Sequence, residues 1–360
     1  MNYIKNLDNE LLKKLGLIIG GILVVLIILL IFIFINGGKL SYSQMENRIL
    51  NAAKRYYKDN EKELPQNNNE VASISSDKLV EKKYIKDLAK LSKNKKDTCT
   101  GNVTVTKNDD LYYYSVTLSC GNNYETKKLK DVIASDVVET GDGLYKYDNT
   151  FIFRGENVNN YVSFAGLTWR ILRINADGSI RMIETTKKQT TPWDDRYNSD
   201  KDYYVGINDY SVSRIKDYID NAYNELKDNE KIYTIKQDLC VGKRTKSDTN
   251  NDGSIECNNT INNQNVGLIQ INEFALASIS DKCVNPLDPN CTNYNYLANS
   301  GYLWTITANK ENTYQAFKIA GNGAVANTTT YNQARMVVHI NPQVNYVSGD
   351  GSIEKPYKFN

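Results

Sequence analysis

The hydrophobic positions of this 360-residue chain begin as one unbroken run and then become periodic. Residues 15–35 read LGLIIGGILVVLIILLIFIFI and contain no charged residue. At about 1.5 Å per residue, a helix of this length spans roughly 31 Å, close to one hydrocarbon core. The run is longer than the apolar region of a secretory signal peptide, and no small-residue cleavage site follows it. The pattern therefore predicts one membrane-spanning helix over residues 15–36, after a cytoplasmic tail of residues 1–14.

The next segment has the spacing of an amphipathic helix. In SYSQMENRILNAAKRYYKDNEKELP, the apolar residues recur at helical intervals, namely Met45, Ile49, Ala52, Ala53 and Tyr56. Ser43 and Glu46 have the spacing of a capping box at its start. SSDKLVEKKYIKDLAKL shows a similar periodicity and predicts a second helix, capped by Ser76 or Asp77.

Two segments further on alternate polar and apolar residues, which is typical of strands. They are TGNVTVTK and LYYYSVTLSC, and the turn between them falls at residues 108–110. Cys99 enters the first strand and Cys120 leaves the second, so a hairpin brings the two close together. Residues 38–130 are therefore interpreted as a small membrane-proximal module of helices and a hairpin.

From about residue 142 the pattern changes to short strands separated by turn residues. FIFRGENVNNYVSFAGLTWRILRINADGSIRMIETT holds three strand signals, and its Asn-Ala-Asp-Gly at 175–178 predicts a hairpin turn. LTWRILRI has apolar residues on both faces, which indicates a central strand. VSRIKDYIDNAYNELKD has helical spacing. GLIQINEFALAS, GYLWTITAN, YQAFKIAGNGAVA and ARMVVHINPQV are interpreted as a strand, a strand, a hairpin and a strand, so residues 142–360 predict an α+β domain.

The charged residues exclude one class of partner and leave the orientation open. Lys and Arg number 44 and Asp and Glu 42, so the chain lacks the basic excess of a nucleic-acid-binding protein. Lys5, Lys13 and Lys14 precede the apolar run. Lys39 and four further basic residues, the last of them Lys58, follow it. The positive-inside rule therefore does not favour a cytoplasmic N-terminus.

The cysteines give a clearer indication of orientation. All six follow the apolar run and fall into three neighbouring pairs, which predicts disulfides and an oxidising compartment. Large C-terminal domains are also translocated largely regardless of flanking charge. We therefore expect a cytoplasmic N-terminus and extracellular C-terminal domains. The predicted pairs are Cys99 with Cys120, Cys240 with Cys257, and Cys283 with Cys291.

The order of elements up to residue 130 resembles one class of bacterial surface protein. An apolar N-terminal helix, an amphipathic continuation and a small sheet are similar to the pilin-like and pseudopilin-like proteins of Gram-positive bacteria. The chain departs from that pattern because no prepilin peptidase site with Gly before the apolar run is apparent. The resemblance therefore implies a membrane-proximal stalk rather than a pilus subunit.

Four motifs after residue 142 carry a second resemblance. NNYVSFAGLTWRILRI, GYLWTIT, AFKIAGNGAV and ARMVVHINPQVNYVSGDGSIEKPYKF occur in this order. They resemble a family of bacterial surface domains of unknown function, which is similar to the C-type-lectin-like fold shared with formylglycine-generating enzyme. The resemblance implies this fold for residues 142–360.

The activities of the fold's known members do not carry over to this chain. Formylglycine-generating enzyme uses a reactive cysteine pair and bound copper, whereas Cys283 and Cys291 lie in KCVNPLDPNC, a Pro-containing loop typical of a structural staple. Calcium-dependent lectins use short Glu-Pro-Asn-like and Trp-Asn-Asp-like signatures, and neither is found. G-x-S-x-G, H-E-x-x-H and a phosphate-binding glycine loop are also missing, so no catalytic residue is assigned.

Residues 248–257, DTNNDGSIEC, begin like a calcium loop. With Asp248 as position 1 of an EF-hand-type loop, Gly253 falls at position 6 and Asn259 at position 12, where it cannot supply the bidentate carboxylate. Asp-Gly-Ser-Ile recurs at 177 and 350 without the preceding oxygens, so a plain polar turn is the alternative to a weak structural calcium site. The candidate ligands are Asp248, Asn250, Asp252, Ser254 and Glu256.

TPWDDRYNSD contains the best candidates for ligand contact. Trp193, Asp194 and Asp195 combine an aromatic ring with two carboxylates, an exposed cluster that can contact sugars; a solvated loop is the alternative. The single histidine, His339, lies in apolar MVVHINP and is expected to be buried and structural. Other large side chains within strands are expected to be structural, namely Trp169, Trp304, Arg170 and Arg335.

These patterns favour a single-pass, cell-surface binding or adhesion protein without catalytic activity. We expect loops near residues 187–212 and 241–265 to bind a glycan, a cell-wall polymer or another protein. Gly16 and Gly20 form a GxxxG motif, through which two anchors can associate. The alternatives are an unrecognised or degenerate enzyme on the formylglycine-generating-enzyme-like fold and a structural subunit of an envelope complex.

Overall fold

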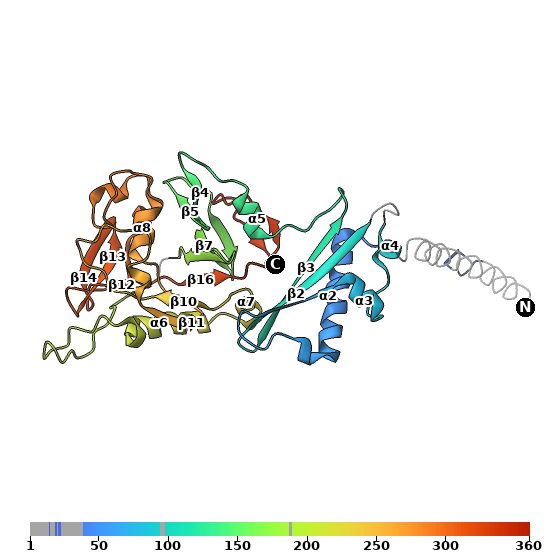
Figure 1. The fold of residues 1–360 in the computed structure, drawn as a ribbon, viewed down its shortest axis with the longest axis horizontal. Helices are drawn as coiled ribbons and strands as arrows, with labels where there is room; N and C mark the ends of the chain where they lie inside the picture. The colour runs from blue at the N-terminus through green and yellow to red at the C-terminus, as the bar shows by residue number, and fades with distance from the viewer. Residues whose placement is uncertain (1–13, 15–18, 20, 23–38, 94–97, 187–188) are drawn as a thin grey trace, which may run out of the picture. The chain divides into compact units, whose positions relative to one another are not determined.

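The computed structural model describes residues 14, 19, 21–22, 39–93, 98–186 and 189–360 (Figure 1). The membrane span predicted at 15–36 and the motif at Gly16 and Gly20 lie almost entirely outside the described residues. Among the helices that are described, none combines the length and the apolar character needed to cross a membrane.

The described chain divides into two compact units that interleave in sequence. The sequence predicts a single boundary between residues 130 and 142, whereas contacts in the structure group several segments on each side. Unit 1 contains Met1–Asp59, Ile74–Val103 and Val116–Glu125, and unit 2 contains Asn60–Ser73, Thr104–Ser115 and Thr126–Asn360.

Unit 1 contains helix α2 (Tyr42–Asp59), whose buried face consists of the residues that set the periodicity, with Tyr57 added. Its N-terminal cap lies before the predicted one. Ser41 Oγ accepts from the backbone N of Gln44 at 3.3 Å, and Gln44 Oε1 accepts from the backbone N of Ser41 at 2.9 Å. This reciprocal pair is the capping box that the sequence placed at Ser43 and Glu46.

The second predicted helix is interrupted. It forms α3 (Ser76–Glu81), capped by Ser75, and α4 (Leu88–Leu91), capped by Asp87. Between them Lys83 adopts the left-handed conformation, with a φ of 63°. This conformation ends an α-helix. The prediction of one continuous helix is therefore wrong.

The predicted hairpin is present and belongs to a small sheet. Its strands lie in the order β1 (Val71–Ser75), β2 (Cys99–Asn108) and β3 (Leu111–Cys120). The turn of the hairpin falls at residues 109–110, and Asp109 has a positive φ of 52°. The Cys99–Cys120 disulfide joins the ends of the two strands, as predicted.

The largest sheet described in unit 2 contains the predicted central strand. Gly178, with a φ of 80°, allows the predicted turn between β7 and β8. Strand β7 pairs with β5 and β6 on one side and with β8 on the other. The order is β16 (Val337–Ile340), β8 (Ile180–Glu184), β7 (Leu167–Ile174), β5 (Thr150–Arg154) and β4 (Gly143–Tyr147), with β6 (Tyr161–Phe164) also on β7.

The other sheet contains the predicted strand and hairpin from the C-terminal half. Its β13–β14 hairpin pairs Gln315 with Asn327, and β12 pairs with β13 in the antiparallel direction and with β15 in the parallel direction. The order is β14 (Asn322–Asn327), β13 (Gln315–Ala320), β12 (Tyr302–Ala308), β15 (Asn332–Gln333) and β9 (Thr190–Thr191).

GLIQINEFALAS contains helix α8 (Ile271–Ala277) and not the predicted strand. The backbone N of Gln270 donates to Glu273 Oε2 at 2.9 Å, a capping bond that starts the helix. Six of its seven residues are buried. A segment that is buried on all sides has no clear period, so the sequence pattern does not separate a helix from a strand.

The remaining elements complete unit 2. Buried side chains of both sheets, of α6 and of α8 belong to one hydrophobic core. The mixed α+β class is therefore confirmed. The other helices are α5 (Leu129–Ala134), α6 (Arg214–Asn224) and α7 (Asp228–Lys231), with short 3-10 turns at Glu61–Glu63, Tyr210–Val212, Glu256–Asn258, Pro289–Thr292 and Ala298–Ser300. The other strand pairs are β10 (Gln237–Cys240) with β11 (Thr260–Gln264) and β17 (Tyr346–Ser348) with β18 (Lys358–Phe359).

Candidate functional site

The candidate site is a loop of unit 2, residues 194–207, which we call the tyrosine loop. Trp193, just before it, is fully buried and donates from Nε1 to the carbonyl of Thr305 at 3.0 Å. The backbone N of Trp193 donates to the carbonyl of Thr328 at 2.7 Å. Thr328 Oγ1 donates to the carbonyl of Val205, at the far end of the loop, also at 2.7 Å. Thr328 therefore holds both ends of the loop together.

Two buried polar side chains fix the path inside the loop. The carboxylate of Asp194 accepts from the backbone N of Arg196 at 3.1 Å and from its Nη2 at 2.7 Å. Asn198 Nδ2 donates to the carbonyl of Gly206 at 2.7 Å. The backbone N of Asn198 donates to the carbonyl of Tyr203 at 2.9 Å. These bonds make the loop a narrow, internally bonded hairpin.

Gly206 lies where the hairpin is narrowest. Its φ is 78°, a conformation that favours glycine. A Cβ at this position would lie 2.1 Å from the carbonyl oxygen of Asp194 and 2.4 Å from Thr328 Oγ1. Only glycine fits here, so the sequence of the loop is adapted to this close approach.

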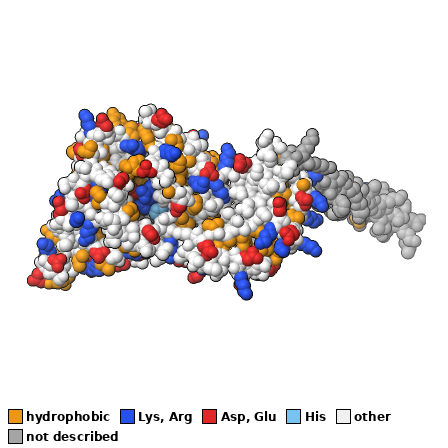
Figure 2. Space-filling model, viewed as in Figure 1, with side chains coloured by type: hydrophobic (Ala, Val, Ile, Leu, Met, Phe, Trp, Pro, Cys, Tyr) orange, Lys and Arg blue, Asp and Glu red, His pale blue; other side chains and the backbone are white. Residues whose placement is uncertain are grey.

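The tip of the tyrosine loop carries three exposed tyrosines. Tyr203 and Tyr204 are 66% and 67% exposed, and Tyr197 is 46% exposed. The rings of Tyr197 and Tyr204 meet edge to face with their centroids 5.5 Å apart, and Tyr197 Oη donates to the carboxylate of Asp202. Figure 1 shows this yellow-green loop extending away from the strands of unit 2, and Figure 2 shows orange and red side chains at its end.

This arrangement is suited to binding a carbohydrate. A tyrosine ring presents a flat apolar face and a hydroxyl, so it can pack on the C–H face of a sugar and hydrogen-bond at its edge. The carboxylates of Asp200 and Asp202 can accept hydrogen bonds from sugar hydroxyls. Because rigid aromatic side chains lose little conformational entropy on contact, a pre-arranged pair of rings favours binding.

The residues predicted as an exposed cluster are mostly not exposed. Trp193 and Asp194 are buried, so the expectation that they form an exposed cluster is wrong. Asp195 is half-buried and forms an ion pair with Arg214 at 2.7 Å. The exposed tyrosines at 197, 203 and 204 were not among the predicted residues, although YNSDKDYY combines Tyr with Asn and Ser, a composition typical of recognition loops.

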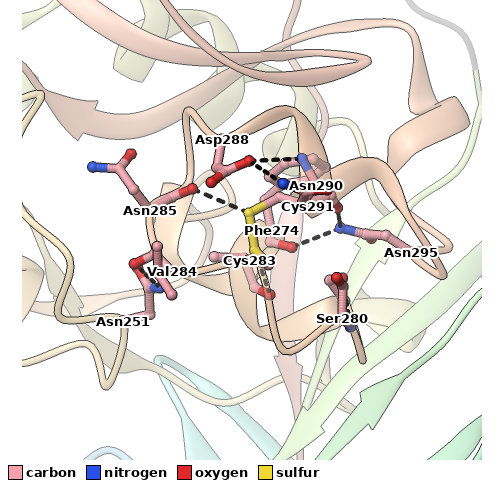
Figure 3. The surroundings of a disulfide bond; sticks show 12 residues. Asn251, Phe274, Ser280, Cys283, Val284, Asn285, Asp288, Asn290, Cys291 and Asn295 are labelled. Carbon is pink, nitrogen blue, oxygen red and sulfur yellow. Dashed lines mark hydrogen bonds between the residues drawn. A yellow bond between two sulfur atoms is a disulfide. The ribbon is translucent and has the colours of Figure 1, made fainter.

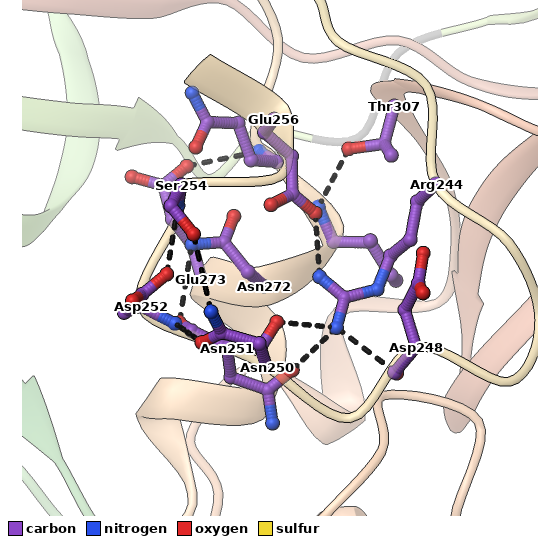
Figure 4. Close-up of polar contacts among 12 residues, drawn as sticks. Arg244, Asp248, Asn250, Asn251, Asp252, Ser254, Glu256, Asn272, Glu273 and Thr307 are labelled. Atoms are coloured by element: carbon purple, nitrogen blue, oxygen red, sulfur yellow. Dashed lines mark hydrogen bonds and ion pairs between the residues drawn. The ribbon is translucent and has the colours of Figure 1, made fainter. Parts of the chain in front are cut away.

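The predicted calcium loop surrounds a buried arginine (Figure 4). Arg244 is fully buried, and its Nη1 donates to Glu256 Oε1 at 2.8 Å. Its Nη2 donates to the backbone carbonyls of Asn250 at 2.6 Å and Asp248 at 3.1 Å. Burial raises the pKa of Glu256 above its usual value, although Arg244 opposes this shift. A guanidinium thus supplies positive charge among the oxygens that the sequence assigned to calcium.

The side-chain oxygens of the candidate ligands are bonded within the same loop. Asp248 Oδ2 accepts from the backbone N of Thr245 at 2.8 Å. Asn250 Oδ1 accepts from the backbone N of Asp252 at 3.0 Å, and Asp252 Oδ1 accepts from that of Ser254 at 2.8 Å. These bonds are turn chemistry, in which each side chain bonds the backbone two or three residues away.

The calcium site nevertheless stays a prediction. In the described part of the chain, no group of three or more His, Cys, Asp or Glu side chains is arranged to hold a metal ion. Glu256 Oε2 and Asn272 Oδ1 are buried acceptors without a hydrogen-bond partner among the described residues. A calcium titration decides whether a calcium ion binds these oxygens or whether Arg244 alone neutralises the loop.

All six cysteines lie in the described residues and form the three predicted disulfides, which are confirmed. Two of the disulfide-closed loops bond to each other (Figure 3). Asn285, between Cys283 and Cys291, donates from Nδ2 to the carbonyl of Asp248 at 2.9 Å. Asn251 Nδ2 donates to the carbonyl of Val284 at 3.2 Å. The disulfide between Cys283 and Cys291 thus closes a short loop, and the two asparagines join that loop to its neighbour.

His339 lies in a buried polar cluster in the core of unit 2. Arg181 binds Glu273 with both Nε and Nη2, at 2.6 and 2.9 Å. Arg181 Nη1 lies 3.3 Å from His339 Nε2, which therefore accepts and belongs to a neutral imidazole. Burial, Arg181 and Arg173 together hold the pKa of His339 well below its usual value. Burial raises the pKa of Glu273, but Arg181 and Arg173 outweigh it, so that pKa is lowered.

Protonation of His339 on unfolding is expected to make the protein less stable in weak acid. The folded pKa lies below the unfolded value of about 6.5, so the unfolded chain binds the proton first and the free energy of unfolding falls as the pH drops below about 6.5. We expect a loss of about 1.4 kcal/mol between pH 7.5 and 5.5. Urea unfolding at the two pH values measures it.

The control for this pH dependence is His339→Gln. The chain contains one histidine, so the variant removes the only side chain whose ordinary pKa lies in this interval. Carboxylates that begin to titrate near pH 5.5 remain the same in both proteins. An equal pH dependence in the wild type and the variant would contradict the assignment to His339.

Arg170 is held by aromatic rings. Its guanidinium lies over the rings of Tyr161 and Tyr296, at 4.5 and 4.4 Å from their centroids. Its Nε donates to Asn160 Oδ1 at 2.7 Å. Cation–π contacts and this hydrogen bond therefore hold the guanidinium in place.

The other residues expected to be structural lie in the interior. Trp169 and Trp304 are fully buried, and each donates from Nε1 to a backbone carbonyl, of Phe164 and of Thr191, both at 3.0 Å. Arg335 is buried and donates from Nη2 to the carbonyl of Ser300 at 2.8 Å. The polar atoms of these large side chains are thereby satisfied inside the core.

Comparison of the chain with protein-family models, with curated proteins and with solved structures finds no match. The resemblances to pilin-like proteins and to the C-type-lectin-like fold stay predictions from the sequence.

Proposed function

We propose that the chain is a membrane-anchored binding protein that contacts a carbohydrate through the tip of the tyrosine loop. In this proposal the apolar run at residues 15–36 is the anchor and residues 38–130 form a pilin-like stalk. Residues 142–360 form the displayed, C-type-lectin-like domain outside the cell. The protein acts by adhesion and not by catalysis.

The observation that carries the proposal is the contrast between the base and the tip of this loop. The base is built from fully buried Trp193 and Asp194, whereas the tip exposes Tyr197, Tyr203 and Tyr204. Large exposed aromatic side chains are costly to solvate and are typical of recognition surfaces when a rigid scaffold presents them. The ring pair and the carboxylates at the tip favour a sugar over an extended apolar ligand.

The disulfides support an extracellular position for both units. Cys99–Cys120 lies in unit 1, and the other two disulfides lie in unit 2. Disulfides form and persist in oxidising compartments and are rare in reducing ones. An anchor at the N-terminus then places the tyrosine loop in the medium, where a carbohydrate on a wall or on another cell is accessible.

Removing the two most exposed rings is expected to abolish carbohydrate binding. The full chain in a mild non-ionic detergent is applied to a glycan array, and the affinity for the best ligand is then measured by titration. Tyr203→Ala combined with Tyr204→Ala is expected to lower the affinity by up to roughly a thousandfold, because two aromatic hot spots contribute about 2 kcal/mol each and every 1.4 kcal/mol is tenfold.

Tyr331→Ala is the matched control, because Tyr331 is 64% exposed and lies outside the tyrosine loop. It is expected to bind like the wild type. Equal loss in the control and in the double variant, or no binding to any glycan by the folded wild type, would overturn the proposal. Turnover of a glycan without stable binding would favour the alternative of an enzyme.

A further inference from the structure

Unit 1 contains a groove of about 820 Å³. Of the described residues that line it, none is Asp or Glu. Its lining includes three buried or half-buried apolar side chains, Leu40, Ile85 and Leu91, which we call its floor. We call it the basic groove because its lining includes the cations Lys39, Arg48, Lys83 and Lys86.

Hydrogen bonds fix the segments that line the basic groove. The backbone N of Leu40 donates to the carbonyl of Leu91 at 2.7 Å, which ties the start of the described segment to the end of α4. Arg55 Nη2 donates to the carbonyl of Tyr84, another lining residue, at 2.8 Å. The hydroxyl of Tyr84 donates to Asp59 Oδ2 at 2.8 Å. The wall between α3 and α4 is therefore fixed to helix α2.

One lysine of the groove is kept in a conformation that favours glycine. Lys83 has a φ of 63° directly after the end of α3, where the backbone N of Tyr84 donates to the carbonyl of Leu79 at 2.9 Å. Glycine is the preferred residue at this position of a helix end, because it has no Cβ to strain. A lysine here costs stability and places one more cation at the groove.

The nearest carboxylates in the sequence are engaged elsewhere. Glu81 pairs with Lys82 at 3.5 Å. Asp87 accepts from the backbone N of Ala89 at 2.9 Å and caps α4. The positive charge of the groove is thus not cancelled by the residues that line it, and an anion with an apolar part would complement both its rim and its floor.

The position of the groove in the chain indicates which anion. Lys39 follows the last residue of the apolar run, Ile35, by four positions, so an extended chain covers at most roughly 14 Å between them. In an anchored protein this distance places Lys39 near the head groups of the leaflet in which the run ends. A lipid phosphate lies at that level, with glycerol and acyl carbons next to it.

We propose that the basic groove binds the phosphate of an anionic phospholipid and packs its apolar floor against the carbons next to the head group. The inference rests on the proposed membrane anchor, but it concerns a second binding site, in unit 1. Its cations would hold the stalk to the membrane surface, and binding weakens as salt screens them.

Hydrogen exchange of the full chain tests the proposal. The protein is placed in dodecyl maltoside micelles that contain either phosphatidylglycerol or phosphatidylcholine, and exchange is followed in peptides that cover residues 40–48 and 83–91. We expect phosphatidylglycerol to slow the exchange and phosphatidylcholine to leave it unchanged. Arg48→Glu with Lys86→Glu is expected to raise the phosphatidylglycerol concentration for half-protection by roughly thirtyfold.

Lys54→Glu with Lys58→Glu is the matched control, because it changes the formal charge by the same amount and neither residue lines the groove. It is expected to keep the protection of the wild type. If the groove variant fails to form the Cys99–Cys120 disulfide and is therefore misfolded, Lys39→Gln with Lys86→Gln is used as the groove variant. No protection by phosphatidylglycerol, or equal loss in both double variants, would refute the lipid site.

Two further experiments identify the source of the phosphate and test the membrane anchor separately from the groove. If soluble glycerol phosphate protects the same peptides as well as the lipid does, the groove takes a phosphate polymer and the lipid assignment fails. Micelles do not require a spanning helix, so flotation with phosphatidylcholine vesicles tests the anchor by itself. A chain that fails to float but shows lipid-specific protection retains the groove and loses the anchor.

Discussion

Replacing Arg244 by methionine is expected to lower the free energy of unfolding of unit 2 by about 3–5 kcal/mol. The variant removes the guanidinium that bonds Glu256 and the carbonyls of Asp248 and Asn250, and it leaves a buried carboxylate without its partner. Breaking one side of a buried ion pair is costly because the remaining charge is desolvated. Tryptophan fluorescence during urea unfolding measures the effect, since all three tryptophans lie in unit 2.

A second substitution separates the charge from the packing. Arg244→Met combined with Glu256→Gln is expected to recover most of the lost stability, because no unpaired charge then remains. Lys246→Met, an exposed position in the same loop, is expected to change stability by less than about 0.5 kcal/mol. Equal stability of the single Arg244 variant and the wild type would contradict the structural role of this arginine.

The same loop gives the calcium readout. Several millimolar calcium is expected to leave the wild-type unfolding midpoint unchanged, because Arg244 already neutralises Glu256 and the side-chain oxygens bond the backbone. A calcium-dependent rise in the midpoint that Glu256→Gln abolishes would instead establish the metal site. The Arg244→Met variant is the more sensitive test of calcium binding, because it frees the oxygens that a calcium ion would use.

Glu273→Gln is expected to destabilise unit 2 by a similar amount, about 3–5 kcal/mol. Glu273 is buried and takes a bidentate bond from Arg181, and Arg173 Nε lies 3.9 Å from its Oε1. It also accepts the capping bond from the backbone N of Gln270. The amide keeps the shape of the side chain but leaves two arginines without the neutralising charge. Urea unfolding followed by tryptophan fluorescence measures the loss.

Glu225→Gln is the matched control for this cluster, because Glu225 is exposed at the end of α6. It is expected to change stability by less than about 0.5 kcal/mol. A further check is pH: the pKa of Glu273 is lowered, so the stability that it contributes is present above its unfolded pKa and is lost as the pH falls through its folded pKa. A Glu273→Gln variant as stable as the control would show that the buried arginines do not require this carboxylate.

Sequence periodicity predicted the elements whose two faces differ. Helix α2 buries the residues at helical spacing, and the β2–β3 hairpin alternates as expected. Pairing of the cysteines followed from their order because each pair closes a short loop. These features depend on local spacing, which a single sequence contains.

Features that depend on distant partners could not be predicted in this way. Trp193 can be buried because its Nε1 finds a hydrogen-bond partner in the carbonyl of Thr305, 112 residues later in the chain. Helix α8 is surrounded by core on nearly all sides, so its pattern carries no period. Lys83 ends a helix in a conformation that a sequence pattern assigns to glycine.

The candidate sites show the same limit. Oxygen-bearing residues at alternate positions indicate a cation, but the pattern does not say whether that cation is calcium or the guanidinium of Arg244. The acidic residues after Trp193 indicated an exposed cluster, but Trp193 and Asp194 are buried. The exposed side chains of this segment are tyrosines, because Asp194 and Asn198 fold the loop back on itself.

The burial of His339 determines how the charge on the protein surface responds to mild acid. Its imidazole is withdrawn from solvent, and side chains of Asp, Glu, Lys and Tyr with ordinary pKa values do not change charge between about pH 6 and 7.5. The outer electrostatic field of the protein therefore stays nearly constant over this interval, even while its fold is being weakened. Mild acid would therefore act on this protein through the stability of its fold and not through the charges on its surface.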